Sequence, residues 1–366
     1  MLSNIINGSR ALERVLASEE LSFNDGMELM NGDNLFMLGS IADKVRKQVK
    51  GDIVTFTASY YLNYTNVCAA SCPLCAFYRK GKEPDAYTLT AEQILERVNT
   101  AVQMGATEMH IVGGFHPDLE LEYYENMMRS IKQKFSNVTI KAFTPAEIFF
   151  IAKVTHNTIK EVLLRLKECG LDALAGGGAE IFHPEPRKQI VIGKCSGDEW
   201  LQVAELAHTL GIRGNCTMLY GHVEKPEHII DHIMKLRELQ KKTKGFLTFI
   251  PLKFSPENTE LQQKGLVKAP SSAIYDLRII AVSRLMLANA INSISAYYIA
   301  LGKKLTQVAL AYGASDLVGT AFAEEIFRAT GLTYSSTVEE LANMIKEIKR
   351  IPAQRDTFHN IIKRFN

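Results

Sequence analysis

Short strand-like runs alternate with helical patterns along most of this chain, and this alternation constrains the fold more than any other feature. Capping boxes that begin at Thr90, Ser196 and Ser336 mark the starts of three of the helices. Repeated strand–helix units form parallel sheets, because each helix carries the chain back to the start of the next strand. The predicted strands cover residues 53–62, 108–112, 138–142, 173–175, 215–219, 247–251, 290–295 and 308–312.

Eight such units predict an α/β fold, a (β/α)8 TIM-type barrel, and 366 residues suffice for one large barrel with additions. An open, six-stranded partial barrel is the alternative, because the last two strand patterns are the weakest. We place the barrel at residues 49–320. A polar-rich helical cap precedes it over 1–48, and a helical extension packed on the barrel follows over 321–366.

The composition is that of an ordinary globular protein and excludes several classes. The net charge is +2, which argues against a nucleic-acid-binding protein. We find no signal peptide and no stretch near the ~20 apolar residues that span a bilayer, so we expect a cytoplasmic protein with no membrane partner. Six cysteines are too few for a disulfide scaffold in a chain of this length.

Three of these cysteines, Cys68, Cys72 and Cys75, follow the first predicted strand with the spacing C-x3-C-x2-C. Loops at this end of barrel strands carry active sites. A structural zinc site needs four ligands, and the nearest histidines, His110 and His116, are separated from the loop by a predicted helix. A redox C-x-x-C pair leaves Cys68 unexplained. An iron–sulfur cluster uses all three thiolates and leaves one iron of a cubane open.

This motif, with Phe77 behind it, resembles the signature of the radical S-adenosylmethionine (SAM) enzymes. The resemblance implies a 4Fe-4S cluster whose open iron binds the amino and carboxylate groups of SAM. It also implies an external one-electron donor of the flavodoxin or ferredoxin type. One electron then cleaves the C5′–S bond of SAM and releases a 5′-deoxyadenosyl radical. An iron–sulfur protein that carries electrons and binds no SAM is the alternative from another class.

Further segments fit this resemblance. Gly113 and Gly114 follow the second predicted strand, where the superfamily contacts the methionine amino group. Gly221, after the fifth strand, matches a position used near the adenine, and Phe77 is a further cofactor contact. Three glycines precede Glu180 at the end of the fourth strand, which makes that acid a partner for ribose hydroxyls or for the sulfonium side of SAM. A solvated loop acid is the alternative for Glu180.

Three longer runs, 176–182, 215–222 and 249–259, resemble the aminofutalosine synthase family, and the resemblance extends over roughly residues 50–330. It implies a transferase of menaquinone biosynthesis. There the 5′-deoxyadenosyl radical adds to the enol ether of 3-(1-carboxyvinyloxy)benzoate, and rearrangement with loss of carbon dioxide gives 6-amino-6-deoxyfutalosine. Dehypoxanthine futalosine cyclase and the deazaflavin (FO) synthase share this scaffold and remain alternatives.

A small-molecule aromatic substrate with two carboxylates needs cationic or hydrogen-bonding groups in the barrel. Lys253 ends the sixth predicted strand, and strand ends point into the site. His116, His183 and His222 each follow a predicted strand, so they are candidates for binding a carboxylate or moving a proton.

Overall fold

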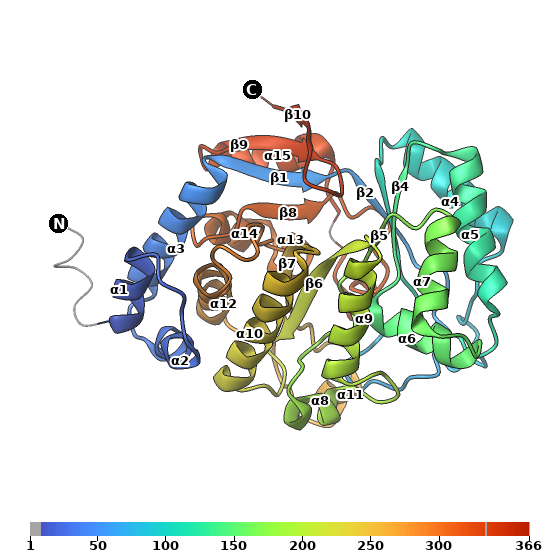
Figure 1. Ribbon diagram of the computed structural model, residues 1–366, viewed down its shortest axis with the longest axis horizontal. Coiled ribbons are helices and arrows are strands. Elements are labelled where there is room, and N and C mark those ends of the chain that lie inside the picture. The colour runs from blue at the N-terminus through green and yellow to red at the C-terminus, as the bar shows by residue number, and fades with distance from the viewer. Residues whose placement is uncertain (1–8, 334, 366) are drawn as a thin grey trace.

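The computed structural model describes residues 9–333 and 335–365, and its centre is a ring of parallel strands (Figure 1). The strands of this ring are β1 (Ile53–Thr57), β2 (Ser59–Leu62), β3 (Glu108–Ile111), β4 (Thr139–Ala142), β5 (Ala173–Leu174), β6 (Arg213–Tyr220), β7 (Phe246–Lys253) and β8 (Asp316–Gly319). Strands β2 to β7 form one sheet in sequence order, and β8 pairs with β1 in a second sheet.

Isolated bridges connect the two sheets around the barrel. Ile294 pairs with Phe249 of β7, and Ser295 pairs with Asp316 of β8. The predicted seventh strand is therefore reduced to two bridging residues. The predicted TIM-type α/β fold is confirmed. The first predicted strand is confirmed as two short strands that meet at Ala58.

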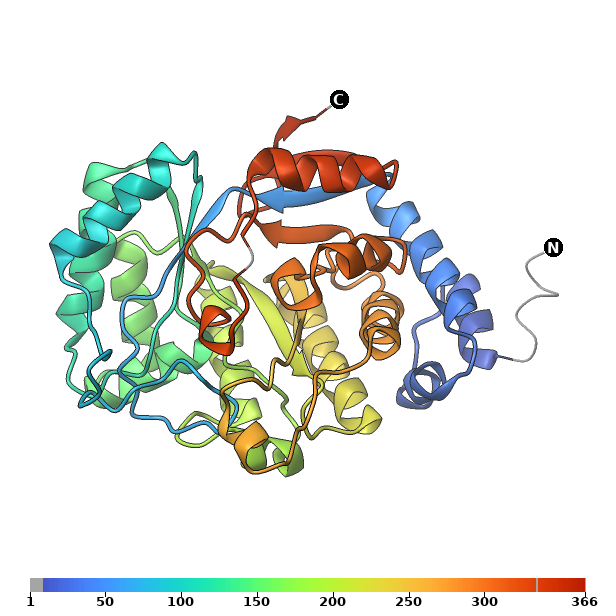
Figure 2. The same ribbon diagram turned by 180° about the vertical axis from the view of Figure 1, so that it is seen from behind.

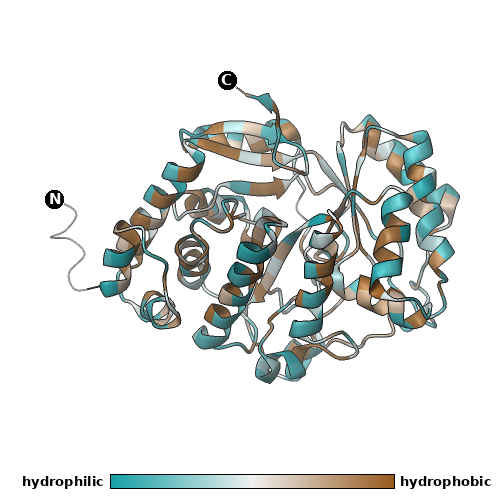
Figure 3. Cartoon of the chain, viewed as in Figure 1, coloured by the Kyte–Doolittle hydropathy of each residue, from teal (hydrophilic) through white to brown (hydrophobic). Residues whose placement is uncertain are grey.

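Helices cover the outside of the barrel and carry both hydrophilic and hydrophobic residues, as a surface layer on a core requires (Figure 3). They are α4 (Ala91–Gln103), α5 (Leu121–Lys134), α6 (Pro145–Val154), α7 (Ile159–Glu168), α8 (Pro184–Ile190), α9 (Gly197–Thr209), α10 (Pro226–Thr243), α11 (Glu260–Gln263), α12 (Ala273–Met286), α13 (Tyr298–Leu301) and α14 (Lys303–Leu310). The capping boxes at Thr90 and Ser196 are confirmed, whereas the third starts one residue later than predicted, at Thr337.

The predicted N-terminal cap is helical over its described part, since residues 1–8 lie outside the described residues. It consists of α1 (Arg10–Leu16), α2 (Phe23–Asn31) and α3 (Leu35–Lys50), of which α2 and α3 pack on α12. Within the part of the chain that the structure describes, no helix is both long enough and apolar enough to cross a membrane.

The predicted strand at 308–312 is wrong. Residues up to Leu310 belong to helix α14, and the eighth strand lies at 316–319 instead. The run contains a β-branched and an aromatic residue, which favoured a strand. However, Thr306, Ala309 and Leu310 are the buried residues of the segment, and this spacing is that of one helix face.

The extension after residue 320 is only partly helical, so that prediction needs correction. Helix α15 (Val338–Glu347) is followed by β9 (Ile351–Arg355) and β10 (Ile361–Arg364). Strand β9 pairs in parallel with β1, from Ile53 with Ile351 to Phe56 with Gln354. No local sequence pattern predicts this strand, because its hydrogen-bond partner β1 lies about 300 residues earlier in the chain.

The end of β9 and the turn that follows it make buried polar contacts at the floor of the barrel. Arg355 forms an ion pair of 2.7 Å with Asp316, and the hydroxyl of Thr357 donates to the carboxylate of Glu108 at 2.7 Å. Burial alone would raise the pKa of the Asp316 carboxyl, but the adjacent guanidinium holds that pKa well below its ordinary range. The barrel is thus closed at this end.

Candidate active site

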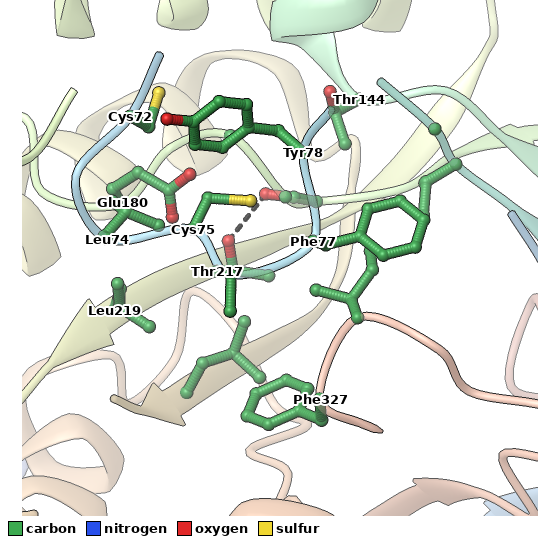
Figure 4. Close-up of a pocket in the computed structure, with 18 of the residues that line it drawn as sticks. Cys72, Leu74, Cys75, Phe77, Tyr78, Thr144, Glu180, Thr217, Leu219 and Phe327 are labelled. Carbon is green, nitrogen blue, oxygen red and sulfur yellow. Dashed lines mark hydrogen bonds between the residues drawn. The ribbon is translucent and has the colours of Figure 1, made fainter. Parts of the chain in front are cut away.

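A chamber of about 270 Å³ lies inside the opposite end of the barrel (Figure 4). Figure 4 shows Cys72 and Cys75 at one side, Phe327 at the other, and Thr217 and Leu219 between them. The carboxyl ends of parallel strands meet at this end, which is where barrel enzymes build their sites. The predicted site residues that line the chamber are Cys68, Cys72, Cys75, Phe77, Gly113, Gly114, Glu180 and Lys253.

The cysteine loop is held by backbone hydrogen bonds that leave its sulfurs at the chamber wall. The N–H of Phe115 donates to Sγ of Cys68 at 3.3 Å, and the N–H of Ala69 donates to the Phe115 carbonyl at 2.7 Å. The ammonium of Lys80 donates to the carbonyls of Cys68 and of the two following residues. Three thiols from one ordered loop, one already receiving an N–H bond, suit the sulfur ligand set of an iron–sulfur cluster.

Gly113 and Gly114 are required by close packing against this loop. A Cβ on Gly114 would lie 2.2 Å from the carbonyl oxygen of Val67, and one on Gly113 would lie 2.7 Å from the Tyr64 ring. The carboxylate of Glu147 accepts the Gly113 N–H at 3.0 Å. The double-glycine turn and the cysteine loop are therefore in direct contact.

Glu180 faces a cation that sequence reasoning missed. Its carboxylate forms a buried ion pair of 2.9 Å with Lys194, whose ammonium also lies 5.8 Å above the Phe115 ring. Burial would raise the pKa of Glu180, but the charge of Lys194 lowers it, so the acid is ionised. Burial raises the pKa of the Cys75 thiol, and the same lysine opposes that shift. A positive charge therefore faces the thiols.

Lys253 reaches the chamber, and two donors of its ammonium are engaged in protein contacts. It donates to the carboxylate of Asp276 at 2.7 Å and to the Ser271 carbonyl at 2.9 Å. Gly221, the predicted adenine contact, is outside the chamber lining. A Cβ there would meet the Ser271 side chain at 3.0 Å, and its φ of +85° requires glycine.

The three predicted histidines do not meet in the chamber, because local structure uses each of them. His116 accepts the Asp118 N–H at 3.1 Å beside a separate surface hollow. His183 caps α8, and its ring stacks on that of His228 at 4.3 Å. His222 is packed between backbone groups and Glu224, with its Nδ1 accepting the following N–H at 2.7 Å.

His183, Glu185 and His228 are close enough together to hold a metal ion, because their potential ligand atoms lie within 4.8 Å of one another. In both rings Nδ1 accepts a backbone N–H, from Glu185 and from Lys225. A neutral ring then carries its proton on Nε2, which removes the lone pair that a metal would need. The cluster is therefore a pair of helix caps.

The chamber also contains a group of polar side chains that sequence reasoning did not bring together. Tyr61, His110, Tyr297 and Glu324 all line it, although they come from β2, from β3 and from the segments that precede α13 and follow β8. Figure 2 shows the segment after β8 crossing in front of the barrel strands. No motif marks these positions, since only folding brings them together.

The sequence relationships agree with this geometry. The radical SAM superfamily matches residues 62–236, and the CofH/MqnC C-terminal region matches residues 243–364. An aminodeoxyfutalosine synthase of Thermus thermophilus is 38% identical over 96% of this chain and 95% of its own. A 5-amino-6-(D-ribitylamino)uracil–L-tyrosine 4-hydroxyphenyl transferase of Methanothermobacter thermautotrophicus is 37% identical over 97% of this chain and 96% of its own.

Solved structures show the same fold at low identity. Methylornithine synthase (PylB) superposes with a TM-score of 0.73 at 20% identity, covering 94% of this chain and 97% of that one. The hydrogenase maturase HydG of Carboxydothermus hydrogenoformans gives 0.74 at 19%, covering 96% and 80%. The chain belongs to the radical SAM superfamily, within the group that carries the CofH/MqnC C-terminal region. It is an enzyme that uses a 4Fe-4S cluster and SAM.

Proposed function

We propose that this enzyme is an aminodeoxyfutalosine synthase, which joins the 5′-deoxyadenosyl group to 3-(1-carboxyvinyloxy)benzoate with loss of carbon dioxide. The observation that carries the proposal is the composition of the chamber. The runs 176–182, 215–222 and 249–259, which resemble that family, all contribute lining residues. The Thermus thermophilus relative of that name supports the same assignment.

In this proposal the cofactors occupy the cysteine side of the chamber. Cys68, Cys72 and Cys75 hold the cluster, and the turn at Gly113 binds the amino acid part of SAM. Bound there, the cluster and SAM supply the 5′-deoxyadenosyl radical. Glu180, fixed by its ion pair, binds the ribose hydroxyls or stands near the sulfonium.

The other side of the chamber receives the aromatic substrate. Apolar side chains form much of its wall, with Leu219, Ile250, Leu252 and Phe327 among the lining residues. Such a wall excludes water, which protects a radical intermediate from side reactions. Lys253 uses two of its three ammonium donors in protein contacts, so the third is left for a substrate carboxylate.

A second candidate is transfer of the 4-hydroxyphenyl group of tyrosine to 5-amino-6-(D-ribitylamino)uracil. It is favoured by relatives of that name at 35–39% identity, from Methanopyrus kandleri among other archaea. Both reactions start from SAM and an aromatic compound, so the class of chemistry is common to them.

Mass spectrometry of the products separates the two candidates. The anaerobically reconstituted enzyme is reduced and given SAM with either the enolpyruvyl benzoate or tyrosine plus the ribitylaminouracil. We expect an adenosyl-containing, decarboxylated product from the first mixture only. A coupled hydroxyphenyl product from the second mixture, with none from the first, would reverse the assignment.

A further inference from the structure

The chamber contains a polar layer formed by two neighbouring strands. Tyr61 of β2 and His110 of β3 are opposite each other in the strand register, and their rings stack at 4.4 Å with an angle of 27°. The phenol of Tyr297 lies beside that of Tyr61, and each shifts the pKa of the other. This places an imidazole and two phenols side by side on the wall of the chamber.

His110 has unused hydrogen-bonding capacity. Its Nδ1 is buried and has no partner among the described residues. Burial lowers the pKa of the imidazole to about 3, so the ring is neutral at physiological pH. A buried polar atom without a partner costs free energy, which a ligand that orders this layer can recover.

Glu324 supplies a carboxyl group to the same layer. Its oxygens accept the N–H groups of Ile326 at 3.0 Å and of Phe327 at 2.7 Å, and within the described ranges it forms no ion pair with a lysine or arginine. Burial raises the pKa of Glu324 to about 7. The titratable groups that face it are Tyr61, Tyr297, Tyr298 and Glu325.

The neighbouring acid has the opposite environment, which makes it a matched control. Glu325 accepts the hydroxyl of Tyr87 at 2.7 Å and pairs with Arg97 at 3.4 Å. It is not among the residues that line the chamber. Thus Glu324 faces the chamber without a cation, while Glu325 binds the segment to α4 and to the loop before it.

We propose that Glu324, together with His110 and the Tyr61–Tyr297 pair, forms a subsite that binds a carboxylate of the aromatic substrate, with Glu324 as a hydrogen-bond donor in its neutral form. This inference rests on the proposed function, because that reaction takes an anionic aromatic substrate. Two carboxylates in contact cannot both stay ionised in a buried site, so one retains a proton. When the anion binds to an enzyme with ionised Glu324, one proton is taken up from solvent onto that group.

Anaerobic titration calorimetry of the cluster-loaded enzyme with SAM tests the subsite. Heats of binding for 3-(1-carboxyvinyloxy)benzoate, measured in buffers of different ionisation enthalpy, give the number of protons taken up. With Glu324 near pKa 7, we expect about 0.9 proton per bound anion at pH 8, and about tenfold weaker binding at pH 8 than at pH 6. SAM affinity is the control for an intact chamber.

Glu324→Gln keeps a donor and an acceptor but removes the titration. We expect proton uptake to vanish and the affinity to change less than about twofold between pH 6 and pH 8, while Glu325→Gln behaves as the wild-type enzyme. Uptake that survives in Glu324→Gln, or is absent from the wild-type enzyme, overturns the subsite. Proton release on binding tyrosine, whose ammonium favours an ionised acid, would overturn the assignment to a carboxylate.

These results separate the subsite from the proposed function. Proton uptake that depends on Glu324 supports the subsite, even if mass spectrometry finds no adenosyl product from the same ligand. Product formation without such uptake overturns the subsite and leaves the proposed function in place.

Discussion

Replacement of Gly114 by alanine tests the contact between the double-glycine turn and the cysteine loop. The new Cβ would lie 2.2 Å from the carbonyl oxygen of Val67, 2.8 Å from its carbonyl carbon and 3.1 Å from Cβ of Cys68. Ordinary contact starts at 3.4 Å, so the turn and the loop must separate by 1.2 Å (3.4 minus 2.2). The atoms in the clash are backbone atoms and the Cβ of Cys68, so no flexible side chain can relieve it.

A shift of about 1 Å at a site of this kind costs on the order of 100-fold in rate, and overpacking costs about 1–3 kcal/mol in stability. We therefore expect Gly114→Ala to form 5′-deoxyadenosine about 100-fold more slowly than the wild-type enzyme, with less iron per chain after reconstitution. The assays are iron and sulfide content and the rate of SAM cleavage by the dithionite-reduced protein.

Gly177→Ala is the matched control, because it adds a methyl group to the same chamber. There the nearest atom is the side-chain methyl of Thr144 at 3.1 Å, so a shift of only 0.3 Å (3.4 minus 3.1) restores ordinary contact. We expect this variant to cleave SAM within about threefold of the wild-type rate. A Gly114→Ala enzyme with full iron content and unchanged SAM cleavage would refute the packing argument.

Three further predictions follow from side chains. Cys72→Ala should lose cluster retention and SAM cleavage together, and an active variant would contradict its assignment as an iron ligand. Lys194→Met leaves Glu180 buried without its cation, so we expect a loss of about 3–5 kcal/mol in unfolding free energy, measured by urea denaturation, together with weaker SAM binding. Arg355→Met should cost a similar amount at pH 7. Because the pKa of Asp316 is depressed in the folded state, this ion pair stabilises the protein above the unfolded pKa of about 4, and the cost should shrink as the pH falls below it.

The sequence predicts those parts of the molecule whose signals are local. The strands before Gly113, Glu180 and Gly221 are recognisable from their own residues, and the capping boxes fix several helix starts. The cysteine loop is equally local, since spacing and strand context are enough to indicate its chemistry. The elements that fail are those formed by distant partners, above all β9, which exists because β1 is available to pair with it.

The histidines illustrate a second limit. Position after a strand predicts that a side chain reaches the barrel opening, but it does not say which way the loop turns. The rings of His116 and His183 each accept a hydrogen bond from the backbone N–H two residues later in the chain. These local hydrogen bonds hold both rings outside the chamber. In contrast, His110 lies within a strand and Lys194 in a loop between two helices, and neither position carries a pattern that singles it out.

The pairing of β9 with β1 also has a consequence for how the molecule is made. Arg350 and Asp52, which join these two regions, are 298 residues apart in the chain. During synthesis the N-terminal parts fold first, so the floor of the barrel cannot be sealed until β9 and β10 have left the ribosome. Contacts of such long range form slowly. The cysteine loop therefore forms before β9 and β10 have docked on the barrel. We expect the delivery of iron and sulfide to this loop to compete in time with that docking.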